Sequence, residues 1–120
     1  MSWDVEFYDA CNTDASFVAG ITDFFREHKE NAVAPFARYE LITALGTPDL
    51  ESVGLEGEHN IQLTVWSSSP RTSESLVKNA YTGVNDQLNL MSVYGRSLGF
   101  DAEEKLFGYA MDFVVWFDNP

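Results

Sequence analysis

Residues 105–117 constrain the fold more than any other segment, because they indicate a strand that is apolar on both faces. One face carries Phe107, Tyr109, Met111, Phe113, Val115 and Phe117, and the other carries Leu106, Ala110, Val114 and Trp116. A strand of this kind has to be covered on both sides. Where a sheet has helices on one side only, the second cover has to come from a neighbouring subunit. The segment therefore predicts a sheet that assembles.

Alternating apolar and polar residues predict further strands at 37–45 and 61–66. Another strand, at 93–100, is expected to form a closing hairpin with 105–117 around the turn at 101–104. In the first of these strands, Tyr39, Leu41, Thr43 and Leu45 are expected to share one buried face.

Helical spacing of apolar residues predicts helices on either side of the first two strands. Residues 3–28 contain two such runs, separated by Asn12, Thr13 and Asp14, so we expect a helical hairpin or a kinked helix. Ser69 and Pro70 suit the N-cap and the first position of a later helix. Its apolar face would consist of Leu76, Val77, Ala80, Tyr81, Val84 and Leu88. The predicted fold class is α+β, an antiparallel sheet of about four strands with helices packed on one face.

Length and composition indicate one folded domain that spans residues 1–120. A chain of 120 residues and 13.5 kDa is long enough for one hydrophobic core and too short for two ordinary domains. With 45% hydrophobic and 14% aromatic residues, intrinsic disorder is excluded.

The net charge of −12 excludes several classes of partner. Proteins that grip nucleic acid do so with clustered Lys and Arg, and this chain has 7 basic against 19 acidic residues. Stable nucleic-acid binding is therefore not expected, although DNA could pass by without sticking. Attachment to an anionic membrane is disfavoured by the same charge, and no apolar run reaches the roughly 20 residues of a membrane span. We also expect no secretory signal and, with Cys11 as the single cysteine in a core position, a reducing compartment.

No motif in the chain predicts catalysis, a cofactor or a bound metal. Residues 95–99 read GRSLG and match the G-x-S-x-G elbow of serine hydrolases. That elbow needs a helix after the serine and a histidine later in the chain, whereas His28 and His59 both precede Ser97. One cysteine and two distant histidines do not make a zinc site. The adjacent side chains of Glu103 and Glu104 are expected to point apart on a solvated turn and not to act as an acid–base pair.

Residues 46–59 are expected to form a long acidic hairpin loop that contacts another protein. The loop carries apolar residues that a merely solvated loop, the alternative interpretation, would not need. The predicted interface residues are Asp49, Leu50, Glu51, Val53, Leu55, Glu56 and Glu58, together with Val114 and Trp116 on the outer face of the last strand.

Three motifs in order resemble a known family. They are YELIT at 39–43 with GTP at 46–48, IQLTVWS at 61–67 before a helix, and LFGYAMDFVVWF at 106–117. From about Phe17 onward the chain resembles the tail completion proteins of long-tailed bacteriophages, also called tail terminators or tail-to-head joining proteins. Residues 28–35 depart from the family, which often has an Arg-Ile-Tyr-like segment there, and the helix and last hairpin are more acidic than is typical.

This resemblance implies a non-enzymatic virion assembly protein. It would lie in the tail or neck of the virion and be assembled in the host cytoplasm. Its copies would form a ring, expected to be a hexamer, that caps the tail tube, ends tube polymerisation and joins the tail to the head connector. The implied partners are further copies of itself, the tail tube protein and the head connector or head-closure protein, with DNA only passing through the lumen. Two alternatives remain open: another ring component of the neck, and a small dimeric ligand-binding α+β domain with a closed apolar pocket.

Overall fold

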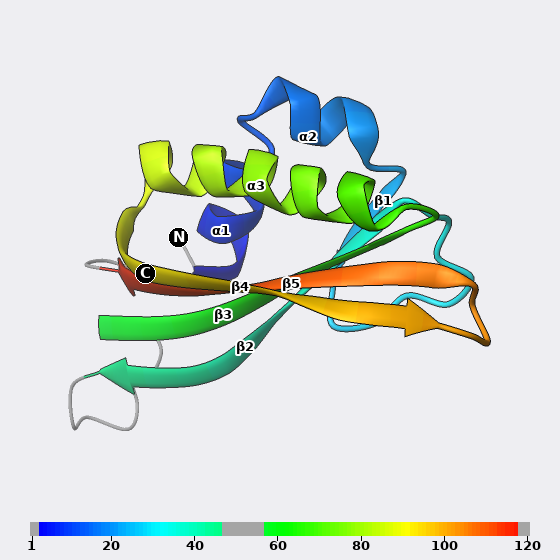
Figure 1. The fold of residues 1–120 in the computed structure, drawn as a ribbon. Coiled ribbons are helices and arrows are strands. Elements are labelled where there is room, and N and C mark those ends of the chain that lie inside the picture. Colours follow the sequence, from blue (N-terminus) through cyan, green and yellow to red (C-terminus); the bar gives the residue numbers. More distant parts are fainter. Residues whose placement is uncertain (1–2, 47–56, 118–120) are drawn as a thin grey trace.

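The computed structural model describes residues 3–46 and 57–117, which form three helices and five strands (Figure 1). In chain order these are α1 (Trp3–Cys11), α2 (Ala15–Gly20), β1 (Asp23–Arg26), β2 (Phe36–Gly46), β3 (Gly57–Ser67), α3 (Pro70–Gln87), β4 (Asn89–Asp101) and β5 (Leu106–Phe117). The molecule is elongated, with extents of 44 × 27 × 23 Å.

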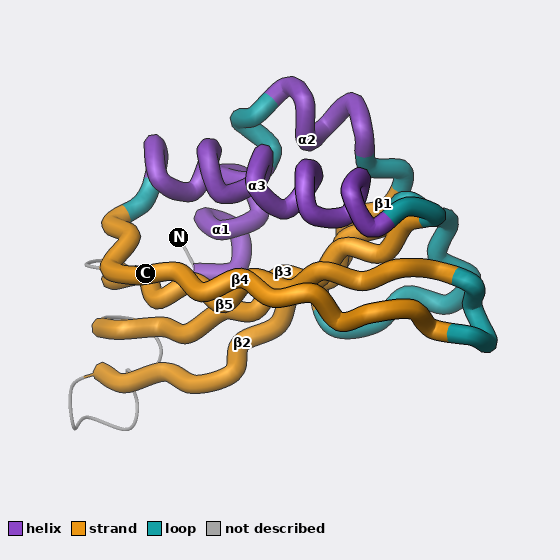
Figure 2. Tube along the Cα trace, viewed as in Figure 1, coloured by secondary structure: helices purple, strands orange, loops and turns teal. Residues whose placement is uncertain are grey.

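The strands form one sheet in the order β1-β2-β3-β5-β4, and the helices lie on one face of it (Figure 2). The α+β class and the one-sided helix layer predicted from the sequence are confirmed. The predicted number of strands is too low by one, because β1 adds a fifth strand. It also makes the sheet mixed, since β1 runs parallel to β2 while the other pairs are antiparallel.

The extra strand lies where the sequence indicated helix. The two predicted helices before it are present, but the second ends at Gly20, and Phe24 and Phe25 belong to β1. Phe24 contacts the rings of Phe17 and Tyr39 at centroid distances of 5.2 and 5.3 Å. Two adjacent aromatic residues fit either periodicity, so the pairing of β1 with β2, rather than local pattern, decides the conformation.

The core lies between the helices and the inner face of β3 and β5. Phe7 of α1 packs edge-on against Phe113 of β5 at 5.4 Å, and Val77 and Val84 of α3 are fully buried above the same strands. Cys11 is also fully buried, as expected, and its burial raises the pKa of the thiol. The alternation of apolar residues in 105–117 therefore identified the buried inner face of the last strand correctly.

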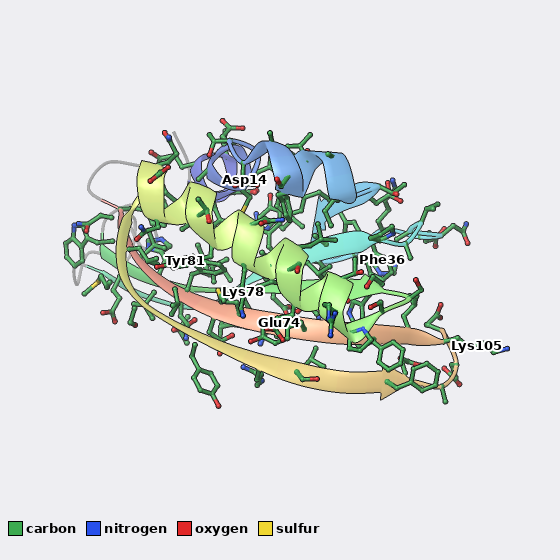
Figure 3. The ribbon with its side chains drawn as sticks, turned by 45° about the horizontal axis from the view of Figure 1, so that its top comes forward. Asp14, Phe36, Glu74, Lys78, Tyr81 and Lys105 are labelled. Carbon is green, nitrogen blue, oxygen red and sulfur yellow. The ribbon has the colours of Figure 1, made fainter. Side chains whose placement is uncertain are left out.

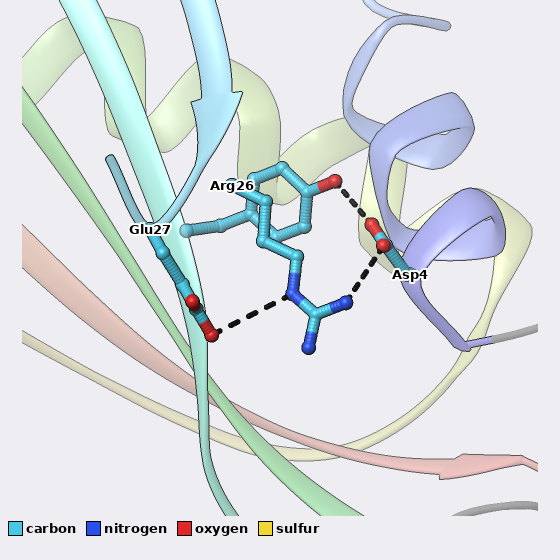
Figure 4. A network of polar contacts seen from close by, with 4 residues as sticks. Asp4, Arg26 and Glu27 are labelled. Atoms are coloured by element: carbon cyan, nitrogen blue, oxygen red, sulfur yellow. Dashed lines mark hydrogen bonds and ion pairs between the residues drawn. The ribbon is translucent and has the colours of Figure 1, made fainter. Parts of the chain in front are cut away.

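A polar cluster fastens α1 to the edge of the sheet (Figure 4). The Arg26 guanidinium contacts the Asp4 carboxylate at 3.0 Å and lies over the Trp3 ring, 4.7 Å from its centroid. The Tyr39 hydroxyl donates to the other Asp4 oxygen. Burial of the phenol, together with this hydrogen bond to Asp4, raises the pKa of Tyr39, so the hydroxyl stays a donor.

β-bulges interrupt two of the antiparallel strands, β2 and β4. Register shifts occur between Leu41 and Thr43 in β2, and between Leu90 and Ser92 and between Ser97 and Gly99 in β4. A bulge adds one residue and reverses the alternation beyond it. Thr43 consequently pairs with Asn60 and does not continue the inner-face series of Tyr39 and Leu41. The prediction of a single uninterrupted buried face is wrong at Thr43, which is exposed.

Helices α1 and α3 approach most closely at Gly83. A Cβ atom at this position would lie 2.2 Å from the backbone oxygen of Ala10, well inside contact distance. A side chain larger than hydrogen is thus excluded unless α1 moves. A glycine costs an exposed helix about 1 kcal/mol relative to alanine, and here that cost allows the two helices to pack.

We expect Gly83→Ala to destabilise the protein by about 1–3 kcal/mol despite the better helix propensity of alanine, because the added methyl overpacks the α1–α3 contact. Thermal unfolding followed by circular dichroism measures the change. Thr82→Ala, at the exposed neighbouring position, is the matched control and should leave the midpoint nearly unchanged. Equal or higher stability of Gly83→Ala would show that the helices do not meet as described.

Candidate assembly surface

Strand β4, of 13 residues, forms one edge of the sheet, and among the described strands it pairs with β5 alone. Natural edge strands are usually blunted by shortness, proline or charge, especially lysine. Strand β4 is long and contains no proline or lysine. Its charged residues are Arg96 and Asp101, and Arg96 is already paired with Asp112 of β5 at 3.0 Å. Two β-bulges interrupt this edge, but shortness, proline and lysine do not protect it against pairing.

Large apolar side chains are exposed along the same strand. The exposed fractions are 53% for Met91, 38% for Val93, 64% for Tyr94, 41% for Leu98 and 54% for Phe100. Single exposed apolar residues are ordinary, but five along one edge strand mark a candidate interaction site, and they lie on both faces, since Val93 pairs with Phe113 and Tyr94 with Asp112. We call β4 with these five side chains the β4 edge.

Two members of the β4 edge, Met91 and Leu98, stand at the bulges and have no partner residue in β5. Bulges increase local twist and redirect side chains. Because the bulge residues are not needed for pairing within the sheet, their apolar character is not explained by the fold of one subunit.

The catalytic-looking pattern lies inside this edge. Ser97 is a strand residue opposite Tyr109, and its hydroxyl accepts a hydrogen bond from the Gly99 backbone N–H at 3.2 Å. Gly95 leaves room for the Tyr109 ring, whose hydroxyl would lie 2.7 Å from a Cβ atom there. No strand–turn–helix elbow is formed at 95–99: Gly95 makes room for Tyr109, and Gly99, with φ of 80°, lies at a β-bulge.

The outer face of β5 is less apolar than its sequence indicated. At its centre Asp112 accepts from Gln62 at 3.1 Å and from Arg96 at 3.0 Å, which makes a polar row across three strands. Val114 is half-buried and Trp116 is exposed at the end of the strand where α3 leads into β4. A neighbour is therefore not required along the whole strand, and apolar surface remains at its two ends.

Most of the predicted loop lies outside the described residues. This applies to Asp49, Leu50, Glu51, Val53, Leu55 and Glu56. The predicted extent of the loop is wrong at Glu58 and His59, because both residues belong to β3, which begins at Gly57. His59 is fully buried, donates a hydrogen bond from Nδ1 to the Gly57 carbonyl at 3.0 Å, and packs against the Phe117 ring.

At the opposite end of the sheet, the outer face carries a groove of about 450 Å³ that the sequence analysis did not identify. Its floor is apolar and consists of Phe25, Phe36, Trp66 and Leu106, and its rim includes Glu27, His28, Lys29, Arg38, Asp101 and Glu104. Figure 3 labels Phe36 and Lys105 at this end of the molecule. The segment between β1 and β2 forms one wall, so the groove depends on the unpredicted strand.

Asp23 holds that wall in place. Its carboxylate accepts from the Val33 backbone N–H at 2.7 Å and pairs with Lys29. The hydrogen bond from Lys29, followed by that from Val33, lowers the pKa of Asp23 below its ordinary value. The floor is rigid as well, since the Phe25 and Phe36 rings stack at 5.8 Å and Gly108 lies directly under the Trp66 ring.

No group of three or more His, Cys, Asp or Glu side chains in residues 3–46 and 57–117 is placed to hold a metal ion. Within the same ranges, no helix has the length and hydropathy to cross a membrane.

No protein-family model matches the chain, and no curated protein matches it. Its fold is similar to that of a chain in a solved structure described as the virion of a native gene transfer agent (GTA) particle. The TM-score is 0.55 at 14% sequence identity, and the match covers 96% of this chain and 93% of the other. Both chains therefore have the same overall architecture over almost their full lengths.

We expect the double substitution Met91→Lys with Leu98→Lys to weaken self-association at least tenfold while thermal unfolding changes little. Two buried positive charges would oppose any contact over the β4 edge, whereas neither residue has a partner in β5. Sedimentation velocity across a concentration series measures the effect. Val18→Lys, which changes an equally exposed apolar residue on α2, is the control. Equal association of both variants would remove the β4 edge from the interface.

Trp116→Ala tests the outer face of β5 separately. The expected result is weaker self-association with a smaller change in unfolding midpoint, because much of the ring surface is accessible in the single subunit. The same sedimentation and melting measurements are compared with those of Tyr8→Ala, which removes a similarly exposed aromatic ring on α1. A large loss of stability with unchanged association would assign Trp116 to folding alone.

Proposed function

We propose that this protein is a non-enzymatic structural component of a phage-like virion that acts as an assembled ring. The observation that carries the proposal is the β4 edge, because an unprotected apolar edge is a liability in a protein that works as a monomer. The fold shared with a chain of a gene transfer agent virion supports the same class.

Within that class, we favour a tail terminator. Its ring, expected to be a hexamer, caps the tail tube, ends tube polymerisation and presents a new face to the head connector. The ordered motifs at 39–48, 61–67 and 106–117 support this role, and their residues 39–46, 61–67 and 106–117 belong to the strands β2, β3 and β5. A ring of subunits with net charge −12 would let DNA pass without retaining it.

Another neck ring component remains the second candidate, because a head-closure protein would need the same self-association. The two differ in their partner: a terminator binds the end of the tail tube, and a head-closure protein binds the connector. The dimeric ligand-binding alternative calls for a closed apolar pocket, whereas the groove is open and has a charged rim.

The decisive experiment is electron microscopy of particles assembled without this protein. A terminator role predicts overlong tails and tails without heads, and purified protein added back should restore joining. The Met91→Lys, Leu98→Lys variant should fail to restore it, and Val18→Lys should succeed. Tails of normal length attached to heads in the absence of the protein would contradict the terminator role, and leakage of DNA from tailless heads would favour head closure.

A further inference from the structure

The floor of the groove is an aromatic surface that the strand pairing holds in place. Phe25, Phe36, Trp66 and Leu106 come from four different strands, and each is half-buried, so part of every side chain remains accessible. Phe36 and Trp66 are register partners, and the Trp66 ring lies against Gly108, where a Cβ atom would be only 2.7 Å from it. The volume of about 450 Å³ falls in the range of ligand and peptide sites.

The basic side chains on the rim of the groove are already neutralised within the subunit. Lys29 pairs with Asp23, and the Arg38 guanidinium lies 3.4 Å from the Glu40 carboxylate. Asp23 is held further by the Val33 backbone N–H, so the Lys29 pair is part of the wall itself. These two cations therefore contribute little net positive charge to the groove.

The acidic side chains on the rim are not neutralised in the same way. Asp101 and Glu104 take part in no ion pair within residues 3–46 and 57–117. The Asp101 carboxylate accepts from the backbone N–H groups of Glu103 and Glu104 at 2.9 and 3.2 Å, which fixes its position and leaves its charge. Glu27 reaches Arg26 only at 3.8 Å. The groove consequently combines an aromatic floor with an excess of negative charge.

The α1 side of the same subunit shows how such a combination holds a cation. There the Arg26 guanidinium lies over the Trp3 ring, 4.7 Å from its centroid, and pairs with the Asp4 carboxylate at 3.0 Å (Figure 4). The ring face attracts the cation through its quadrupole, and indole does so best, while the carboxylate supplies a charge-assisted hydrogen bond. The groove offers the same two groups, an indole ring at Trp66 and carboxylates on the rim.

A second copy of the chain is a poor source of a cation for the groove. Five of its 7 Lys and Arg side chains are in ion pairs within the subunit, namely Arg26, Lys29, Arg38, Lys78 and Arg96. Arg71 and Lys105 are the other two. Each copy also carries a net charge of −12, so that two acidic rims and surfaces would approach one another. The chemistry of the groove favours a different, basic protein.

We propose that the groove binds an arginine side chain and an adjoining apolar residue of another protein. The guanidinium stacks on the Trp66 ring and pairs with Asp101 or Glu104, and the apolar residue contacts Phe25 and Phe36. Arginine fits better than lysine, because its planar guanidinium can stack and pair at the same time. The inference deepens the proposed function and rests on it only for the identity of the partner, a neighbouring component of the tail or neck.

Binding of a short labelled peptide in which leucine and arginine alternate tests the groove in the full chain. Fluorescence anisotropy at about 0.15 M salt measures the affinity, since the general attraction of an acidic protein for cations is screened beyond about 8 Å there. Replacing the leucines by serine should weaken binding about threefold or more, because the aromatic floor is then left uncovered. Replacing the arginines by glutamate should abolish it. Equal binding of either altered peptide would overturn the proposal.

Two glutamates on the same turn provide a matched pair of variants. Glu104 lines the groove and Glu103 does not, although both are exposed and both substitutions by glutamine change the net charge equally. Glu104→Gln should weaken peptide binding about threefold, and Glu103→Gln should leave it nearly unchanged. Equal effects of the two substitutions would show attraction by overall charge alone and would refute a site in the groove.

Trp66→Leu tests the ring, because it keeps an apolar side chain and removes the aromatic face. It should weaken binding of the arginine peptide about fivefold. In the parent protein, the indole N–H signal of Trp66, identified by its loss in Trp66→Phe, should shift on titration more than those of Trp3 and Trp116. Larger shifts of the other two indoles would place the peptide elsewhere and overturn the proposal. The glutamate pair decides the question should Trp66→Leu fail to fold.

Particle assembly separates this inference from the proposed function. Glu104→Gln should self-associate like the parent in sedimentation yet restore head–tail joining less well than Glu103→Gln. Peptide binding in the groove, together with normal particles in the absence of the protein, would refute only the tail role. Failure of the peptide tests, together with rescue of joining by the parent protein, would refute only the groove as a site for arginine.

Discussion

Burial of the inner face of β3 and β5 beneath α1 and α3 is the contact on which the other features depend. It is possible only because Gly83 lets the two helices approach and because Phe7 and Phe113 fill the space below them. With all three helices on one face, no helix in residues 3–46 and 57–117 covers the opposite face. The chain closes the middle of that face with the polar row of Gln62, Asp112 and Arg96 and leaves apolar surface toward its ends. The positions of the candidate surfaces follow from this unequal cover.

The sequence predicted those elements in which all residues follow one periodic pattern of apolar and polar side chains. Strand β5 and helix α3 have long periodic patterns with one strongly buried side, and both were located to within a few residues. Strand β1 could not be predicted, because four residues with adjacent aromatics carry no period and its conformation depends on pairing with β2. The bulges were missed for a related reason. One inserted residue leaves the composition unchanged, and only the register with the partner strand reveals it.

The candidate assembly surface was also predicted only in part, because a residue stands out in the sequence only where it breaks an expected pattern. Trp116 and Val114 stand out in sequence because an outward apolar residue breaks an expected polar face. The exposed residues of β4 do not stand out, since Val93, Tyr94 and Phe100 would be equally natural in a buried strand. Their exposure follows from the strand order, which places the longest strand at the edge. The groove is similarly a product of topology, because residues from β1, β2, β3 and the β4–β5 turn meet only in the folded sheet.

Charge explains why assembly should use these surfaces and few others. Two copies that each carry −12 repel one another at distances up to the Debye length, about 10 Å at 0.1 M salt, so a favourable contact has to be short-ranged and locally neutral. The β4 edge meets that condition with one basic and one acidic residue, and the rim of the groove comes near it, with Lys29 and Arg38 against the acidic side chains of Glu27, Asp101 and Glu104. The surface of α1, where Asp9 is exposed, Glu6 is half-buried and the helix has no basic residue, does not meet it. The acidic composition thus selects among the possible contacts, while the apolar residues of the neutral surfaces provide the attraction.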